Sequence, residues 1–428
     1  MNMVLLVLSM LFFILLGLPI CYALGAASIV YFLSNPGFLI MLPQRMWAGA
    51  NISVMIALPL FIIAGELMNR GGMTRRIIDF SAELVRPFRG GLGEVNVVAS
   101  MIFGGISGSS VSETSALGSV LIPEMVKRGY PLKFSAGLTV AAATMGMIIP
   151  PSIPMIMYSM VSGESVGALF LAGLLPGVLI GLTQLVLCNV ISRRNNYPLS
   201  LGRVSLGVVS RTFRDGILAI LMPVAIIVSV GFGIATATES AGIAVFYALC
   251  VGGLFYKELR LAHLKEVLTK TVIASSSVMI IVAYSLIFTW ILAFEHVPDV
   301  LGAYLVDLNL SRTMLLLLLD AFILFVGCII DVGPAILLLC PILVPVVNQF
   351  GISTLHFGAI LIVGLAIGLV TPPVGMCLYA GSKLSGLPIT TLFLGSWPFL
   401  TCNLIIFFIV TFVPEVSTWV PGLFMGTR

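Results

Sequence analysis

Residues 104–110 read GGISGSS and residues 329–335 read IIDVGPA, and each string interrupts a long apolar stretch. The two stretches, 92–126 and 313–350, are longer than the roughly 20 residues that one helix needs to cross a bilayer. Glycine and proline within the interruptions disfavour a continuous helix. Each stretch is therefore predicted to be a re-entrant helical hairpin, which turns at its interruption and returns to the side from which it entered.

The rest of the composition is that of an integral membrane protein. Of 428 residues, 59% are hydrophobic and 9% are charged, whereas soluble domains carry about 25% charged residues. So little polar surface cannot cover a water-soluble globule, and we expect an all-α polytopic fold in lipid. The other segments long enough to span are 52–70, 135–160, 166–191, 216–234, 236–258, 272–293, 357–382 and 388–414, preceded by two short helices in the first 33 residues.

The basic residues support the hairpin interpretation, because Lys and Arg accumulate in cytoplasmic loops. If both hairpins return to their side of entry, 18 of the 21 Lys and Arg residues share one side, and only Arg45, Arg312 and Arg428 lie on the other. Treating either hairpin as a single crossing scatters these clusters over both faces. Since no basic stripe runs along the chain and the net charge is only +4, nucleic acid is not expected as a partner.

The second half of the sequence repeats the first at a shift of 222 or 223 residues. GMIIPP at 146–151 corresponds to GLVTPP at 368–373, and the pattern SG-x5-LFL occurs at 162–171 and again at 385–394. Such aligned Gly, Pro and aromatic positions predict two copies of one structural unit.

Each copy is predicted to hold one hairpin and one helix broken at a Pro-Pro pair. Within a single integral membrane domain, the assignments are 1–205 for the first repeat (hairpin 92–126, broken helix 135–160) and 206–428 for the second (hairpin 313–350, broken helix 357–382). The first hairpin is flanked by Lys and Arg, whereas the second follows an acidic loop, so the repeats should be inverted. Inverted repeats with broken helices that meet near the midplane are typical of secondary transporters.

The broken segments carry groups that suit a cation and an anion. Non-helical backbone at membrane depth needs partners, glycine allows close approach, and serine adds hydroxyl oxygens that suit a hard cation such as sodium. The helix after each tip presents its positive end to a carboxylate. Alternatively, the Gly/Ser clusters are tight helix packing and the Pro-Pro pairs are kinks. The candidate residues are Gly104, Gly105, Ser107, Gly108, Ser109, Ser110, Pro150, Pro151, Asp331, Gly333, Pro372 and Pro373.

Ionisable residues within apolar stretches are candidates for function. Asp331 occupies the second tip and could ligate an ion directly. Glu113 and Asp320 either take part in function or hold their hairpins together through buried hydrogen bonds. Glu239 and Arg45 are possible substrate or partner contacts, or simply water-facing charges.

Two further segments have assignable roles. Residues 73–85 alternate charged and apolar positions at helical spacing and predict a helix on the cytoplasmic surface, and the polar stretch 195–206 is the expected linker between repeats. The chain has no Walker loop and no H-E-x-x-H motif, so we expect neither an enzyme nor a bound cofactor. Transport would then be driven by an ion gradient or by an associated subunit.

Four strings resemble a known family: GGISGSSVSETSALGSVLIPEMVKRGYPLKFSAG, IIPPSIPMIMY, ATATESAG and IGLVTPPVGMCLY. They are similar to the DctM-like large membrane subunit of tripartite ATP-independent periplasmic (TRAP) transporters. The resemblance implies an elevator-type carrier in the bacterial inner membrane that uses a sodium gradient. It also implies a separate small four-helix membrane subunit and a periplasmic binding protein. By that resemblance, the sodium and substrate sites are lined by residues 104–110, Pro150, Pro151, Asp331, Thr371 and Pro372.

The resemblance leaves the substrate open among small carboxylate-bearing solutes, including C4-dicarboxylates, sialic acid, other sugar acids and keto acids. One alternative is a self-sufficient organic-anion carrier of the same architecture, coupled to sodium or to a proton carried by Asp331. Another is an ion channel or a structural membrane scaffold.

Overall fold

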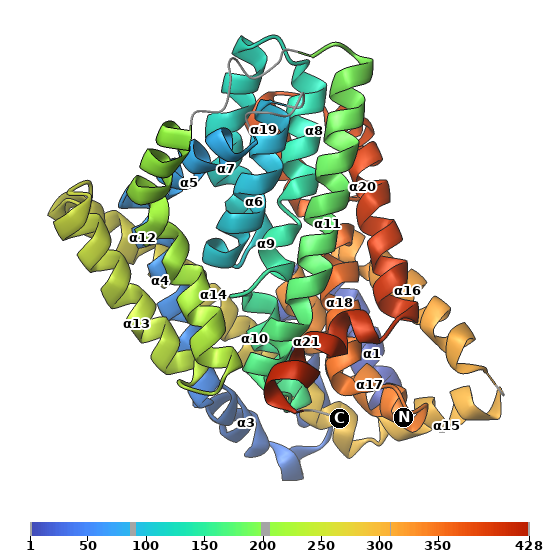
Figure 1. Cartoon of the computed structure of the whole chain (residues 1–428). Helices are drawn as coiled ribbons and strands as arrows, with labels where there is room; N and C mark the ends of the chain where they lie inside the picture. Colours follow the sequence, from blue (N-terminus) through green and yellow to red (C-terminus); the bar gives the residue numbers. More distant parts are fainter. Residues whose placement is uncertain (1, 86–90, 198–205, 309, 427–428) are drawn as a thin grey trace.

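The computed structural model describes residues 2–85, 91–197, 206–308 and 310–426, and these residues form helices without any strand (Figure 1). Nine helical segments in this part of the chain are long and apolar enough to span a membrane, and a pair bent by 118° near the N-terminus makes a tenth if it counts as one span. The prediction of an all-helical polytopic membrane protein is confirmed.

The helices before the segment 198–205 are α1 (Asn2–Leu15), α2 (Ile20–Ser34), α3 (Met41–Ala50), α4 (Ala57–Arg70), α5 (Met73–Leu84), α6 (Leu92–Ser107), α7 (Ser110–Lys127), α8 (Leu132–Ala142), α9 (Met145–Ile148), α10 (Ile153–Ser162) and α11 (Val166–Arg194). Those after it are α12 (Leu206–Gly231), α13 (Ala237–Cys250), α14 (Leu261–Phe294), α15 (Val297–Asp307), α16 (Arg312–Ile329), α17 (Val332–Gln349), α18 (Thr354–Gly368), α19 (Met376–Ser385), α20 (Ile389–Phe412) and α21 (Glu415–Met425).

Three of these helices were not predicted from sequence: α3, α15 and α21. Each has only 10 or 11 residues, too few to cross the hydrocarbon, so a search for spans misses them. Helix α14 is also longer than its predicted span, with 34 residues and a length of about 51 Å at 1.5 Å per residue. It therefore extends beyond the bilayer at its polar N-terminal end.

The predicted hairpin stretches each contain two helices joined by two residues. Helices α6 and α7 are separated by residues 108–109, and α16 and α17 by residues 330–331. The α6–α7 pair lies towards one end of the molecule and α17 towards the other (Figure 1). The division into repeats at 205/206, and most of the linker 195–206, lie outside the described residues and stay predictions.

Helices from the two halves of the chain pack against one another. The second arm of each hairpin contacts the far half of the other broken helix, because α7 packs on α19 and α17 packs on α10. Where α11 meets α20, the buried Gln184 side-chain amide donates to the Asn403 side-chain oxygen at 2.7 Å. Asn403 in turn donates to the Thr144 hydroxyl at 3.0 Å. This polar contact ties both halves to the first helix break.

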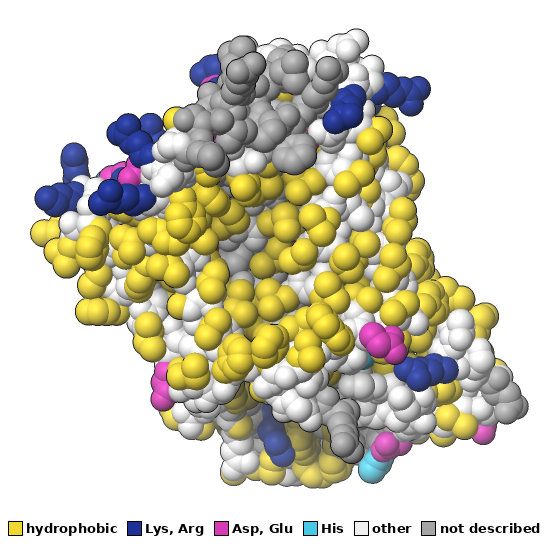
Figure 2. Space-filling view, viewed as in Figure 1, with side chains coloured by type: hydrophobic (Ala, Val, Ile, Leu, Met, Phe, Trp, Pro, Cys, Tyr) yellow, Lys and Arg dark blue, Asp and Glu magenta, His cyan; other side chains and the backbone are white. Residues whose placement is uncertain are grey.

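Charges are segregated along the molecule. In the face shown in Figure 2, most Lys and Arg side chains gather at the end that carries α5, the start of α12 and the end of α11, above a broad hydrophobic belt. Helix α5 lies at that end with Met73 and Ile77 buried and Arg75 exposed, as its amphipathic pattern predicts. The basic end is therefore the cytoplasmic one by the positive-inside rule.

This topology predicts the sidedness of three positions. In a chain whose seven native cysteines are replaced, we expect Lys127→Cys and Asn195→Cys to react with a membrane-impermeant maleimide only after cells are opened. Asp299→Cys, in α15, should react in intact spheroplasts and serves as the control. Labelling of Lys127→Cys and Asn195→Cys from different sides would contradict the hairpin topology.

Candidate functional site

The first hairpin turns at a glycine and a serine cap. Helix α6 ends at Ser107, Gly108 adopts a left-handed conformation with φ +60°, and the Ser109 hydroxyl caps α7 by accepting from the Ser112 N–H at 3.5 Å. The Ser107 hydroxyl donates to the Ser109 carbonyl at 3.3 Å. Because glycine tolerates a positive φ without steric cost, the tip can turn within two residues.

The second hairpin turns at an aspartate cap instead. The Asp331 carboxylate accepts from the Val332 N–H at 2.8 Å and opens α17. Its side chain is exposed in this chain, so the carboxylate can reach a ligand. Gly333, in the first turn of α17, faces Met157 of α10: a Cβ there would lie 3.2 Å from the Met157 methyl.

Each tip is bonded to the broken helix of its own half, just after the Pro-Pro pair. The Ile153 N–H donates to the Gly108 carbonyl at 3.4 Å, and the N–H groups of Val374 and Gly375 donate to the Cys328 carbonyl at 3.1 and 3.3 Å. Both Pro-Pro bonds, 150–151 and 372–373, are cis. The tip carbonyls thereby satisfy N–H groups that the helix breaks leave free.

Glycines allow the same contact between arm and broken helix in both halves. A Cβ on Gly104 of α6 would lie 3.1 Å from the Gly146 Cα, and a Cβ on Gly368 of α18 would overlap the backbone of Gly327 in α16. Gly104 and Gly327 differ by 223 positions, and Gly146 and Gly368 by 222. The contact therefore recurs at the shift that relates the two halves.

Backbone oxygens of the first Pro-Pro pair point at the tip glycines. A Cβ on Gly105 would lie 2.8 Å from the Pro150 carbonyl oxygen, and one on Gly108 would lie 3.1 Å from that of Pro151. The cleft between them is closed to water-sized spheres and is lined by Phe61, Ile106, Ser107, Gly108, Pro151, Ser152, Ile153 and Ile156. The structure thus brings the candidate oxygen donors of the first tip together.

The second break is arranged in a similar way. The Thr371 hydroxyl donates to the Ile367 carbonyl at 3.0 Å, and the Thr371 carbonyl oxygen would lie 3.1 Å from a Cβ on Gly375. This segment adjoins Cys328, which is three residues before Asp331. Asp331, Thr371, Pro372 and Pro373 therefore share one end of the α16–α17 hairpin.

The protein-family model for the DctM component of tripartite ATP-independent periplasmic transporters matches residues 7–416 of this chain. The chain belongs to the DctM family of TRAP permeases. It is a multi-pass protein of the bacterial inner membrane and belongs to a family of transporters rather than enzymes.

Relatives of this TRAP permease match along nearly their whole length. The sialic acid TRAP transporter large permease protein SiaM of Vibrio cholerae is 36% identical, with 96% of each chain covered. The C4-dicarboxylate protein DctM of Pseudomonas aeruginosa is 35% identical (93% of this chain, 92% of that one). The 2,3-diketo-L-gulonate protein YiaN of Escherichia coli is also 35% identical (94% and 95%).

Among solved structures, the YdaH transporter of Alcanivorax borkumensis has a similar fold. It superposes with a TM-score of 0.62 and 15% identity, covering 90% of this chain and 87% of that chain. At 15% sequence identity, this similarity shows that the two proteins share a fold and indicates nothing about a shared function.

Two candidate contacts of the permease lie away from the tips. Arg45 is in α3, where its guanidinium sits 5.6 Å from the centre of the Trp290 ring, rather than in a loop. Glu239 is exposed and closes a capping box at the start of α13, accepting from the Thr236 N–H and hydroxyl at 2.8 Å. The contacts that the structure gives them are with Trp290 of α14 for Arg45 and with Thr236 for Glu239, and not with the tips.

Asp320 forms a buried hydrogen bond, but to α20 rather than within its own hairpin. It is buried in α16, and its Oδ1 accepts from the Thr411 hydroxyl of α20 at 3.2 Å. Sequence reasoning missed several partners of the tip contacts, among them Gly146, Gly327 and Cys328. A signal for Gly327 was present, because Gly327 is the counterpart of Gly104 in the other half of the chain.

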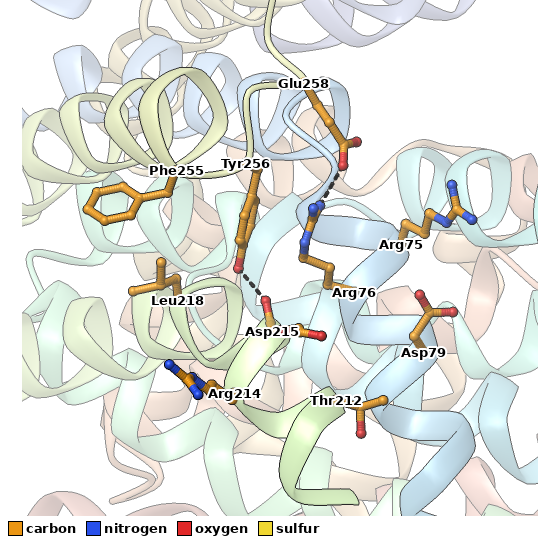
Figure 3. Close-up of a pocket in the computed structure, with 10 residues that line it drawn as sticks. All are labelled: Arg75, Arg76, Asp79, Thr212, Arg214, Asp215, Leu218, Phe255, Tyr256 and Glu258. Atoms are coloured by element: carbon orange, nitrogen blue, oxygen red, sulfur yellow. Dashed lines mark hydrogen bonds and ion pairs between the residues drawn. The ribbon is translucent and has the colours of Figure 1, made fainter. Parts of the chain in front are cut away.

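A separate cavity of about 630 Å³ lies among α5, α12 and the turn after α13 (Figure 3). There Arg76 donates to Glu258 at 2.7 Å and stacks 3.7 Å from the centre of the Tyr256 ring, and the Tyr256 hydroxyl donates to the Asp215 carbonyl at 2.8 Å. Burial raises the pKa of Asp79, against the opposing charges of the neighbouring arginines. The acidic and basic side chains that line the cavity balance one another. We therefore infer that their interactions hold α5 in place.

The glycine contact of the permease gives a stability prediction. Gly368→Ala should lower the free energy of unfolding by roughly 1–3 kcal/mol, because the added Cβ must push two backbones apart. The matched control is Gly242→Ala in α13, where no atom lies within 4 Å of the new Cβ. It should be neutral or stabilising by up to about 1 kcal/mol. Thermal midpoints in one detergent test this, and equal values for both variants would contradict the close approach.

Proposed function

We propose that this TRAP permease is the membrane subunit of a sodium-coupled secondary transporter that imports small carboxylate-bearing solutes. The observation that carries the proposal is the pairing of each hairpin tip with a Pro-Pro break of its own half. Within a bilayer, such irregular backbone is tolerated only where it is buried in protein or lines a water-filled cavity. In secondary transporters, broken helices of this kind bind substrates and coupling ions.

The first tip supplies ligands of the type that sodium prefers. Carbonyl oxygens of Pro150 and Pro151 face the tip glycines, and hydroxyl groups of Ser107 and Ser109 lie in the same turn. The second tip adds the exposed Asp331 carboxylate, three residues after the Cys328 carbonyl that bonds the segment following Pro372 and Pro373. Hard oxygen donors favour an alkali or alkaline-earth cation over a soft metal.

The same tips suit an organic anion. Helices α7 and α17 both begin at a tip, and each has 18 residues, so their N-terminal N–H groups direct positive potential there. A carboxylate can bind at such an end. The names of the relatives, for C4-dicarboxylate, sialic acid and 2,3-diketo-L-gulonate, support a small organic acid as the substrate of this chain.

The transport movement that we propose is of the elevator type. Two inverted repeats contribute the hairpins and the broken helices to a mobile unit, and the flanking helices form a scaffold. The reciprocal packing of α7 on α19 and of α17 on α10 supports a single moving body. Its displacement would expose the site to each side of the membrane in turn.

A small four-helix membrane subunit and a periplasmic binding protein complete the proposed system, as TRAP family membership implies. The binding protein delivers the acid, and the permease couples its entry to sodium. The alternative is a self-sufficient sodium- or proton-coupled carrier, which the architecture of the tips would also allow.

Reconstitution distinguishes these possibilities. In liposomes that contain the permease and its small subunit, we expect saturable uptake of a radiolabelled acid only when the binding protein is present. Uptake should stop when choline replaces sodium at fixed pH. Uptake by the permease alone would favour the self-sufficient carrier, and uptake without sodium at an imposed proton gradient would favour proton coupling. Conduction without saturable counterflow would indicate a channel.

Asp331 provides the residue-level test of the ion site. Asp331→Asn keeps a helix-capping side chain but removes the charge. Because a contact to a charged group is worth about 1.5–3 kcal/mol, the sodium concentration for half-maximal uptake should rise roughly tenfold or more. The control is Ser311→Ala, which removes the cap of α16 far from the tip along the chain. An unchanged sodium dependence in Asp331→Asn would remove this residue from the ion site.

A further inference from the structure

The cavity of about 630 Å³ at the cytoplasmic end is lined by charged side chains that the fold does not pair. Helix α5 contributes Arg75 and Asp79, and helix α12 contributes Arg214 and Asp215. Among the described residues, the only ion pair at this cavity joins Arg76 to Glu258. The arginines of α5 are within electrostatic range of Asp79, yet no guanidinium reaches it. Two positive and two negative side chains are therefore free to meet a ligand.

The walls of the cavity are held by backbone contacts. A Cβ on Gly216 of α12 would lie 3.4 Å from the Arg76 carbonyl oxygen of α5, so the two helices approach closely just after Asp215. The Tyr256 hydroxyl donates to the Asp215 carbonyl at 2.8 Å and carries the Arg76 guanidinium on its ring. These contacts fix the backbones of α5 and α12 and leave the four unpaired side chains exposed.

The cavity lies where the basic end of the molecule meets the hydrophobic belt (Figure 2). Phe255 lines it with 66% of its surface exposed, and its neighbour Leu254 is 70% exposed. In Figure 3, Phe255 and Leu218 lie on one side of the cavity and Arg75 and Asp79 on the other. The cavity thus offers a charged side and an apolar side, as the binding site of an amphiphile must.

The free charges select among phospholipid headgroups. Arginine binds phosphate through charge-assisted hydrogen bonds, which any phospholipid can accept. A headgroup with only negative charge would also meet two aspartates and be repelled. A primary ammonium has three N–H donors for the carboxylates, whereas a quaternary ammonium has none. The volume lies within the range of about 300–1,000 Å³ typical of small-molecule sites.

We propose that this cavity binds a phospholipid with a phosphoethanolamine headgroup. The phosphate meets Arg75 and Arg214, the ammonium meets Asp79 and Asp215, and the acyl chains leave along the exposed face of Phe255. The lipid bridges α5 and α12 and adds to the protein contacts that hold α5 in place. This site goes beyond the proposed function and does not depend on it, because no step of transport enters the argument.

Native mass spectrometry of the full-length chain in detergent tests the site. The chain is titrated with phosphatidylethanolamine, phosphatidylcholine or phosphatidylglycerol of identical acyl chains. We expect the first lipid to bind roughly fivefold more tightly when it is phosphatidylethanolamine, the upper end for partly exposed charge pairs. The variant Asp79→Asn/Asp215→Asn should lose this preference, whereas Arg214→Gln should weaken all three lipids, because they share the phosphate.

The matched control is Arg211→Gln. Arg211 is an exposed arginine of the same helix that does not line the cavity, so its replacement should change neither affinity nor preference. Equal affinities for the three lipids, or tightest binding of phosphatidylglycerol, would overturn the proposal. A preference that survives in Asp79→Asn/Asp215→Asn would do the same. Displacement of the lipid by equimolar soluble O-phosphoethanolamine or inorganic phosphate would show that the ligand is not a membrane lipid.

Thermal unfolding in nanodiscs gives a second readout. The wild type should have a higher midpoint in phosphatidylethanolamine than in phosphatidylcholine, and Asp215→Asn should reduce this difference. Effects of the bulk bilayer act equally on the control Arg211→Gln, which should keep the full difference. An identical difference in Asp215→Asn and in the control would count against the site. If the double variant does not fold, Asp215→Asn alone replaces it in the titration.

Discussion

Carbonyl oxygens at the hairpin tips accept the N–H groups that follow the two Pro-Pro pairs, and the site depends on this interaction. Proline removes a donor and disrupts the helix around it, and water is scarce at membrane depth. Gly108 and Cys328 supply the missing acceptors in the two halves. Each tip and its break therefore stabilise one another, and both remain non-helical where oxygen donors are needed.

The close approach that permits these bonds comes from glycine. Gly104 meets Gly146, and Gly327 meets Gly368, so backbone packs on backbone with no side chain between them. Such contacts let helices approach within a membrane, where dispersion and hydrogen bonding replace the hydrophobic effect between helices.

The two hairpins carry acidic side chains in contrasting surroundings. Asp331 caps α17 and is exposed, so its side chain can reach a ligand. Glu113 is fully buried beside Ser100, and Asp320 is buried and accepts from Thr411. The carboxyl group proposed as an ion ligand is thus the exposed one, whereas the two buried carboxyl groups contact neighbouring helices.

The sequence by itself determined the helical class, the breaks at 150–151 and 372–373, and the residues of both tips, because apolar length, proline and glycine act locally along the chain. The internal repeat also pairs Gly327 with Gly104 in the sequence. Only the tertiary structure decided that Gly104 lies on Gly146, that Asp320 meets Thr411 and that Arg45 lies over the Trp290 ring. These depend on which helices become neighbours, and side-chain pairing between distant segments leaves no local pattern in a sequence where nearly every helix is apolar.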